Sequence, residues 1–173
     1  MATAIRLASA ADLHALSVIF DYGYAFHRAA QPTVFRRAED YRGSDEFLLA
    51  CIHNPQAALL LAEREGQAVG LAYVLERCAP DISVLAPRRY AVLDTLAVLP
   101  EAQHAGIGKA LLAGAEAWAR ERGLVEIELS VWEFNDSARA MYRGAGYETT
   151  RRTMVKALVG SPDEGPGVGP GSP

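Results

Sequence analysis

The sequence has few cysteines, no excess of positive charge and no long apolar run, and each shortage excludes a class of protein. Cys51 and Cys78 are the only cysteines among 173 residues, too few for a disulfide framework or a zinc cage. The net charge of -4 is not the basic excess typical of nucleic-acid binding, so we expect no nucleic-acid partner. No apolar run approaches the ~18 residues of a membrane span, and the first residues do not resemble a signal peptide. These shortages predict a cytoplasmic protein with no membrane partner.

The remaining composition is that of a globular protein with one unusual end. Hydrophobic residues make up 50% of the chain, which suits one domain with a substantial core. From residue 160 onward the chain is mostly glycine, proline, serine and acidic residues, which cannot bury enough apolar surface to become ordered. We therefore expect one domain over residues 1–159 and a disordered tail over residues 160–173.

The spacing of apolar residues predicts alternating helices and strands. Apolar residues recur at helical spacing over residues 11–29 and 107–122, whereas strand-length runs at 57–63 and 68–77 flank a hairpin turn at 65–67. The other expected elements are a strand at 4–7, a helix at 44–53 with Ser44 as its N-cap, an irregular arm at 80–87, strands at 90–98 and 124–131, a short helix at 137–143 and a last strand pair around 147–158. This order predicts an α/β fold, with a mixed sheet covered by helices on both faces.

Residues 90–112 contain the first motif that indicates chemistry. An apolar strand leads into the loop Gln-His-Ala-Gly-Ile-Gly, which opens a helix. Gly106 and Gly108 let the backbone approach a ligand closely, and the first amides of a helix favour anions. Lys109 adds positive charge. A pyrophosphate suits this loop, although the loop alone is also compatible with a plain strand-to-helix turn.

Two common phosphate-binding loops are excluded at single positions. A nucleotide-triphosphate loop requires serine or threonine after its lysine, but Lys109 is followed by Ala110. A dinucleotide-binding loop requires a third glycine, and Leu111 occupies that position. A phosphate-bearing ligand at this loop would therefore be of another kind.

A second motif lies one helix and one strand further on, and together the two resemble the GCN5-related N-acetyltransferase (GNAT) family. The family's phosphate loop is Arg/Gln-x-x-Gly-x-Gly/Ala, matched by Gln103, Gly106 and Gly108. Its next helix carries Asn-x-x-Ala-x-x-x-Tyr followed by Gly-Phe, matched by Asn135, Ala138, Tyr142 and Gly146-Tyr147. His104 stands where many members have glycine, and tyrosine replaces phenylalanine in the last pair. The resemblance implies a mixed, mostly antiparallel sheet with helices on both faces.

The resemblance also implies an enzyme that moves an acetyl group from acetyl-CoA to a primary amine by direct attack, without a metal. Acetyl-CoA would lie where the strands 90–98 and 124–131 separate, and an amide near Val98 would polarise the thioester. The residues implied to bind acetyl-CoA are Leu96, Ala97, Val98, Gln103, His104, Ala105, Gly106, Ile107, Gly108, Lys109 and Asn135.

Two proton-transfer roles follow from this reaction. The resemblance makes Tyr142 the acid for the departing thiolate, since a phenol is protonated at neutral pH. Asp94 is the candidate base, because a carboxylate in an apolar strand is costly unless it is used or paired. It shares strand parity with Val92, Leu96 and Val98, and an Asp bonded to the backbone is the alternative interpretation. Glu76 is the rival base, disfavoured because strand-end glutamates are usually solvated.

The acceptor is less determined by the sequence. An acidic chain without a peptide-binding signature favours a small-molecule amine; the alternatives are a protein N-terminal or lysine acetyltransferase and a non-catalytic acyl-CoA sensor. Tyr142 argues against the sensor, which needs no thiolate acid. His27 lies where the resemblance places the roof of the acceptor site, but a surface or packing role is more common. The family resemblance leaves the choice between monomer and homodimer open.

Overall fold

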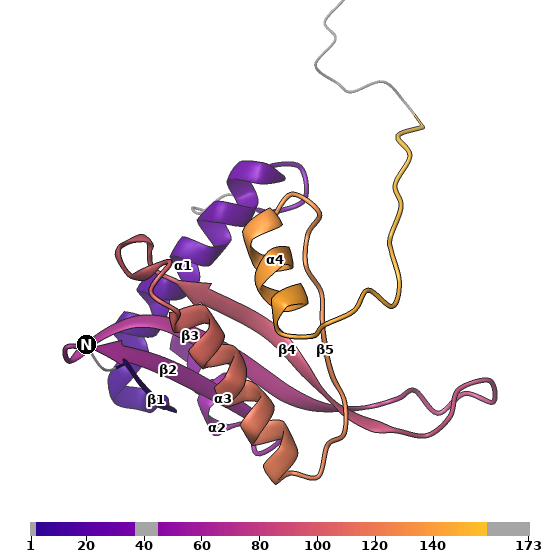
Figure 1. Cartoon of the computed structure of the whole chain (residues 1–173), viewed down its shortest axis with the longest axis horizontal. Helices are drawn as coiled ribbons and strands as arrows, with labels where there is room; N and C mark the ends of the chain where they lie inside the picture. Colours follow the sequence, from indigo (N-terminus) through magenta and orange to yellow (C-terminus); the bar gives the residue numbers. More distant parts are fainter. Residues whose placement is uncertain (1–2, 37–44, 159–173) are drawn as a thin grey trace, which may run out of the picture.

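The computed structural model describes residues 3–36 and 45–158, and these form a five-stranded sheet with helices on both faces (Figure 1). The predicted N-cap Ser44 and the predicted tail lie outside these residues. The predicted mixed sheet is confirmed, since β1 to β4 pair antiparallel in sequence order and β5 pairs parallel with β4. The elements are β1 (Thr3–Leu7), α1 (Leu13–Ala30), α2 (Asp45–His53), β2 (Ala57–Arg64), β3 (Gln67–Cys78), β4 (Arg89–Val98), α3 (Ile107–Glu121), β5 (Ile127–Leu129) and α4 (Asp136–Gly144), with short 3-10 turns at Ala10–Asp12 and Pro100–Ala102.

The middle parts of β2 and β3 are apolar on both faces, because helices cover both sides of the sheet there. Side chains on one face of β2 and β3 pack with α1 and α2, and those on the other face pack with α3. Glu65 and Gly66 both have positive φ in the β2–β3 turn, as a tight hairpin with the twist of its strands requires. The β3–β4 connection, residues 79–88, is the predicted arm, and it projects from the body in Figure 1.

A β-bulge interrupts β4 at Asp94 and changes which residues share a face. The pairing with β3 shifts between Tyr73 and Val74, so that Asp94 has no partner in the register. Leu93 and Leu96, three residues apart, both pack on the α3 side. The prediction that Asp94 shares strand parity with Leu96 and Val98 is therefore wrong, because the extra residue reverses the alternation.

β4 and β5 separate just at this bulge. Their register ends at Leu93 and Leu129, and β4 continues to Val98 while bonding only to β3 within the described residues. β5 is shorter than the predicted strand at 124–131: Val125, within that predicted range, lies outside β5 and is 91% exposed. The outer edge of β5 has no strand partner in the described part of the chain, so little covers Val125.

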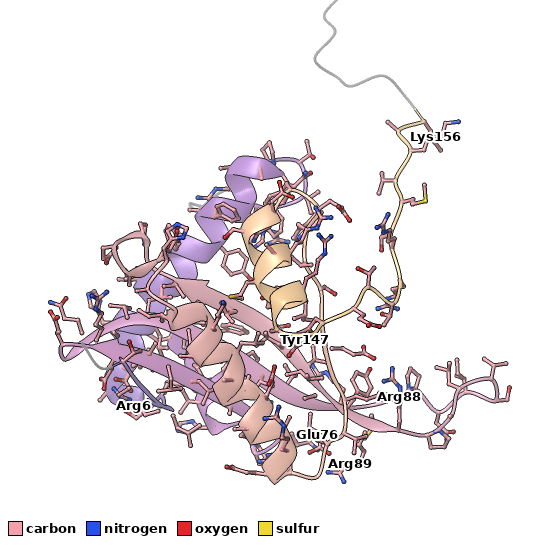
Figure 2. All side chains as sticks on the ribbon, viewed as in Figure 1. Arg6, Glu76, Arg88, Arg89, Tyr147 and Lys156 are labelled. Carbon is pink, nitrogen blue, oxygen red and sulfur yellow. The ribbon has the colours of Figure 1, made fainter. Side chains whose placement is uncertain are left out.

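The predicted strand pair around residues 147–158 does not form. Beyond Tyr147 the segment is irregular and exposed, and Figure 2 shows it leading away from the body as far as Lys156. A strand pair needs a turn, and the twelve residues from 147 to 158 include no glycine, proline, asparagine or aspartate. The sequence prediction overlooked this missing turn.

A substitution at Gly70 can test how tightly the sheet packs against α3. A Cβ at Gly70 would lie 2.9 Å from the Ala97 carbonyl oxygen and 3.1 Å from Leu111 Cδ1. Because a backbone atom cannot easily move away, we expect Gly70→Ala to lower the free energy of unfolding by about 1–3 kcal/mol. Gly144→Ala is the matched control: its Cβ would meet nothing within 4 Å, so we expect a change below about 0.5 kcal/mol. Equal effects in denaturant titrations would contradict this.

Candidate active site

The loop before α3 turns through two left-handed residues. His104 has φ 60° and Gly106, the N-cap of α3, has φ 80°. Glycine adopts this conformation easily, which explains why many family members carry glycine at the position of His104. No side chain caps α3. Its first amides therefore point outward at the positive end of the helix dipole, as an anion site requires.

Gln103 fixes this loop in place. Its Nε2 donates hydrogen bonds to the Val98 carbonyl oxygen at 3.0 Å and to the Tyr22 hydroxyl at 2.8 Å. The loop is thereby tied to the end of β4 and to α1. Gln103 acts on the loop geometry rather than presenting a free amide to a ligand.

Gly108 brings α3, α4 and β4 together. A Cβ at this position would lie 3.0 Å from Met141 Sδ on α4 and 3.8 Å from Leu96 Cδ2 on β4. A larger residue here would press on Met141, so glycine favours close packing of the two helices, in addition to any approach by a ligand. This contact places the predicted phosphate loop, the unpaired end of β4 and the helix of Tyr142 around one opening.

α4 carries the second motif. Asn135 is its N-cap, with Oδ1 accepting a hydrogen bond of 3.1 Å from the Ala138 backbone amide. Tyr142 lies seven residues on, two turns along the same face, and packs against the α3 side of the core. Burial raises the pKa of Tyr142 to about 12, so the phenol is protonated throughout the neutral range.

The two candidate bases have environments opposite to those predicted. Asp94 is exposed at the bulge and accepts a hydrogen bond of 3.0 Å from Thr95 Oγ1, because the bulge turns it out of the apolar strand. Glu76, predicted to be solvated, has a side chain only 10% exposed, with Oε1 2.6 Å from Arg89 Nε and Oε2 3.9 Å from Arg122 (Figure 2). The hydrogen bond from Arg89 lowers the pKa of Glu76, and Arg122 adds to this. Glu76 is also opposite Ala91, where β4 and β5 are still paired.

A group of aromatic side chains near this opening was not predicted as a unit. We call it the aromatic cluster: Phe26 and His27 on α1, Phe35 after α1, and Trp132 and Phe134 between β5 and α4, with neighbouring ring centroids 5.4–6.0 Å apart. The sequence could have indicated part of this cluster, because Trp132 and Phe134 lie just before the motif residue Asn135.

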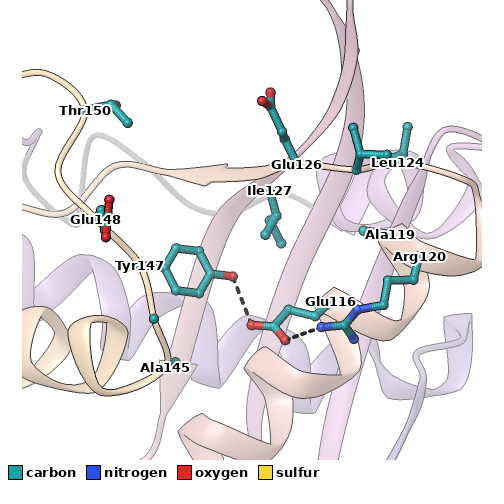
Figure 3. Close-up of a pocket in the computed structure, with 12 residues that line it drawn as sticks. Glu116, Ala119, Arg120, Leu124, Glu126, Ile127, Ala145, Tyr147, Glu148 and Thr150 are labelled. Carbon is teal, nitrogen blue, oxygen red and sulfur yellow. Dashed lines mark hydrogen bonds and ion pairs between the residues drawn. The ribbon is translucent and has the colours of Figure 1, made fainter.

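A cavity of about 470 Å³ lies elsewhere, between the C-terminal half of α3, the outer side of β5 and residues 145–150 (Figure 3). None of the predicted site residues lines it. The Tyr147 hydroxyl donates a 3.3 Å hydrogen bond to Glu116, which is paired with Arg120 at 2.9 Å. Since these groups are engaged with one another, we assign no chemistry to this cavity.

No helix among the described residues has both the length and the apolar character of a membrane span. The same residues contain no group of three or more His, Cys, Asp or Glu side chains arranged to hold a metal ion.

Comparison with known proteins identifies the class to which this fold and site belong. The profile of the acetyltransferase (GNAT) family matches residues 22–147. The uncharacterized N-acetyltransferase YhfO of Bacillus subtilis is 30% identical over 83% of this chain and 89% of its own length. An aminoglycoside N(6')-acetyltransferase type 1 of Klebsiella aerogenes is 31% identical over 59% of this chain and 66% of its own. The crystal structure of a BH1408 variant from Bacillus halodurans superposes with a TM-score of 0.84, at 20% identity, covering 90% of this chain and 99% of that one.

This protein belongs to the GNAT family and is an acetyltransferase. The resemblance inferred from Gln103, Gly106, Gly108, Asn135 and Tyr142 is confirmed at the level of family and fold.

The left-handed turn at His104 provides a test of the loop. A β-branched residue tolerates positive φ poorly, so we expect His104→Val to lower the free energy of unfolding by about 1 kcal/mol or more. His104→Gly should change it by less than about 1 kcal/mol, because relief of the left-handed strain offsets the greater freedom of the unfolded chain. His14→Val, at an exposed position in α1, controls for the loss of histidine. Equal stability of the two His104 variants in urea titrations would show that the turn is not formed.

Proposed function

We propose that this enzyme transfers the acetyl group of acetyl-CoA to the primary amine of a small molecule. The observation that carries the proposal is the separation of β4 and β5 after Leu93 and Leu129, beside the uncapped start of α3. One side of the β4 backbone beyond the bulge is left without a strand partner among the described residues. Such an edge accepts an extended, amide-bearing ligand in the way that a sheet accepts another strand.

The residues around the opening fit coenzyme A. Leu96, Ala97 and Val98 form the strand edge that β5 leaves free for its amide-bearing arm, although Gln103 already donates a hydrogen bond to the Val98 carbonyl oxygen. The loop from Gln103 to Gly108 and the first amides of α3 suit its pyrophosphate, with Lys109 adding charge. Asn135, whose Oδ1 caps α4, offers its side-chain NH2 group to the arm. Acetyl-CoA supplies the activated acetyl group; the protein supplies position and charge stabilisation.

Tyr142 is proposed to donate a hydrogen bond to the sulfur as negative charge develops there. Burial raises its pKa to about 12, so the phenol stays protonated and its O–H can donate to the forming thiolate. The same residue favours an enzyme over a non-catalytic acyl-CoA sensor, which has no thiolate to stabilise.

Asp94 is the proposed base, acting directly or through water. It is exposed at the bulge where the two strands separate, and its bond to Thr95 leaves it accessible. Glu76 is less suitable, because two arginines hold it as a carboxylate of lowered pKa in the paired part of the sheet.

A small-molecule acceptor is supported by charge and by similarity. The chain carries a net charge of -4, which attracts protonated amines. The name of the Klebsiella relative gives aminoglycosides as its substrates, which are small molecules bearing several amines. A protein acceptor is the second candidate. It is tested by assaying thiol release from acetyl-CoA with peptides as well as with small amines.

Binding of acetyl-CoA can be tested by thermal unfolding. A ligand that binds only the folded state adds about 2.7 kcal/mol at a concentration of 100 Kd, so acetyl-CoA should raise the Tm. NAD and ATP should not, because the loop lacks the residues that their binding requires at Ala110 and Leu111. An unchanged Tm with acetyl-CoA at millimolar concentration would overturn the cofactor assignment.

The role of Tyr142 can be tested by Tyr142→Phe. Loss of a hydrogen bond to a developing charge should lower kcat by about 10- to 100-fold, while the Tm shift with acetyl-CoA is retained. Tyr147→Phe is the control: its ring centroid lies 5.8 Å from that of Tyr142, but its hydroxyl bonds to Glu116. We expect Tyr147→Phe to keep kcat within a factor of about three. An unchanged kcat in Tyr142→Phe, measured by thiol release, would rule out the proposed role.

A further inference from the structure

The aromatic cluster is not part of the hydrophobic core. None of its five side chains is among the buried residues of the two core layers. Phe26 is 43% exposed and Trp132 is 40% exposed. Aromatic rings gathered from three separate stretches of chain and left half-open to solvent are typical of a binding surface rather than of packing.

His27 places a polar atom without a partner inside this cluster. Its ring stacks on Phe35 at 5.4 Å and meets the rings of Phe26 and Phe134 edge-on. The Nδ1 atom is buried and has no hydrogen-bond partner within the described residues. An unpartnered buried acceptor is less unfavourable than an unpartnered N–H, so Nδ1 carries the lone pair and Nε2 the proton. Burial lowers the pKa of His27, which favours this neutral form at neutral pH.

The position of His27 in α1 makes a packing role less satisfactory. One side of α1 faces the sheet, and residues at intervals of three or four lie along it: Leu16, Phe20, Gly23 and His27. Leu16 and Phe20 are buried, and a Cβ at Gly23 would lie 3.5 Å from Ala97 Cβ. The next residue of this stripe is a histidine whose Nδ1 is unsatisfied, where an apolar side chain would pack at no such cost.

The cluster lies at the opening between β4 and β5. The contact of Gly23 with Ala97 sets α1 over the unpaired end of β4. Trp132 and Phe134 follow β5, and Phe134 directly precedes Asn135, the N-cap of α4. Figure 1 shows the C-terminal end of α1 beside the start of α4, and the ring contacts confirm that they meet. The cluster therefore joins the two sides of the opening, next to the unpaired backbone assigned to the acetyl donor.

We propose that the aromatic cluster binds the acceptor, that His27 Nδ1 accepts a hydrogen bond from its protonated amine, and that the acceptor is a primary amine on an aromatic or other apolar body. The inference rests on the proposed function, since it names the substrate class of that site. Ring faces attract an organic ammonium, and the unpartnered Nδ1 provides the acceptor that its N–H groups require. Because Nδ1 is buried, this binding requires the half-exposed rings of Phe26 and Trp132 to move aside.

The same surface disfavours aminoglycosides and other hydroxyl-rich amines. Their hydroxyl groups would be stripped of water against aromatic rings that offer no hydrogen bonds in return. An arylalkylamine instead buries its ring among those of the cluster. The residues that determine acceptor specificity are thus His27, Phe26 and Trp132. Tyr142 and Asp94 act instead on the protons of the reaction.

The experiment compares 2-phenylethylamine and tryptamine with kanamycin and ethanolamine. Thiol release from acetyl-CoA gives kcat and KM for each amine, and calorimetry in the presence of CoA gives its Kd independently of turnover. We expect the two arylalkylamines to have KM and Kd values at least about tenfold lower than those of kanamycin and ethanolamine.

The variants are Phe26→Ala, Trp132→Ala and His27→Phe, each with a matched control. Phe47→Ala removes a ring that is 41% exposed but lies on α2, outside the cluster, and His14→Phe changes an exposed histidine on the same helix as His27. We expect Phe26→Ala, Trp132→Ala and His27→Phe to raise KM and Kd for the arylalkylamines about tenfold, with kcat changed less than about threefold. His27→Phe should keep or raise the Tm, because it removes the unsatisfied Nδ1, and the acetyl-CoA shift should persist in all variants. Phe47→Ala and His14→Phe should leave both constants unchanged.

The outcomes separate this inference from the proposed function. Kanamycin or ethanolamine as the better substrate, or an unchanged Kd for arylalkylamines in Trp132→Ala and His27→Phe, would overturn the acceptor assignment while leaving the acetyltransferase intact. A His27→Phe variant that lowers the Tm and kcat without changing KM or Kd would show that His27 is structural. If acetyl-CoA binds but no amine or peptide releases thiol, the proposed function fails, and the calorimetric Kd still decides whether the cluster binds such amines.

Discussion

The proposed active site depends on the end of one hydrogen-bonded register, that of β4 and β5 at Leu93 and Leu129. Up to this point the parallel strands satisfy one another's backbone groups. Beyond it the β-bulge at Asp94 redirects β4, which remains paired only with β3 among the described strands. The edge of residues 94–98 that faces away from β3 has no strand partner among the described residues, and apart from the Val98 carbonyl oxygen, which accepts a hydrogen bond from Gln103, we propose that it is available to a ligand.

Close contacts of the helices hold the elements around the separated ends of β4 and β5 in place. α3 lies close to Met141 of α4 at Gly108, and α1 lies close to Ala97 of β4 at Gly23. Gln103 ties the loop before α3 to Val98 and Tyr22. Each contact joins an element on one side of the opening to β4 or to the opposite helix. The two sides of the opening are consequently assigned different roles: α3 and α4 face the acetyl donor, and α1 with the aromatic cluster faces the acceptor.

The sequence predicted the fold class and the family well, because both depend on residue patterns within single segments. Apolar periodicity located the helices and the central strands, and glycine spacing located the loop before α3. The sequence predictions were wrong where residues far apart in the chain decide whether a side chain is exposed. Asp94 is exposed because β3 imposes a bulge on β4, and Glu76 is covered because Arg89 and Arg122 reach it from other segments. The strand pair at 147–158 was predicted from β-forming residues without the turn that it needs.

By itself, the sequence determined the family, the loop that precedes α3 and the motif residues Asn135 and Tyr142, since each depends on spacing within a single segment. Only the tertiary structure decided where β4 and β5 part, which face Asp94 takes and how α1 meets the connection before α4. These features arise from hydrogen-bond register and side-chain packing between segments far apart in the chain. His27 shows the difference most directly: in the sequence it is one histidine near the end of a helix, and in the fold its ring contacts three aromatic rings and its Nδ1 has no hydrogen-bond partner among the described residues.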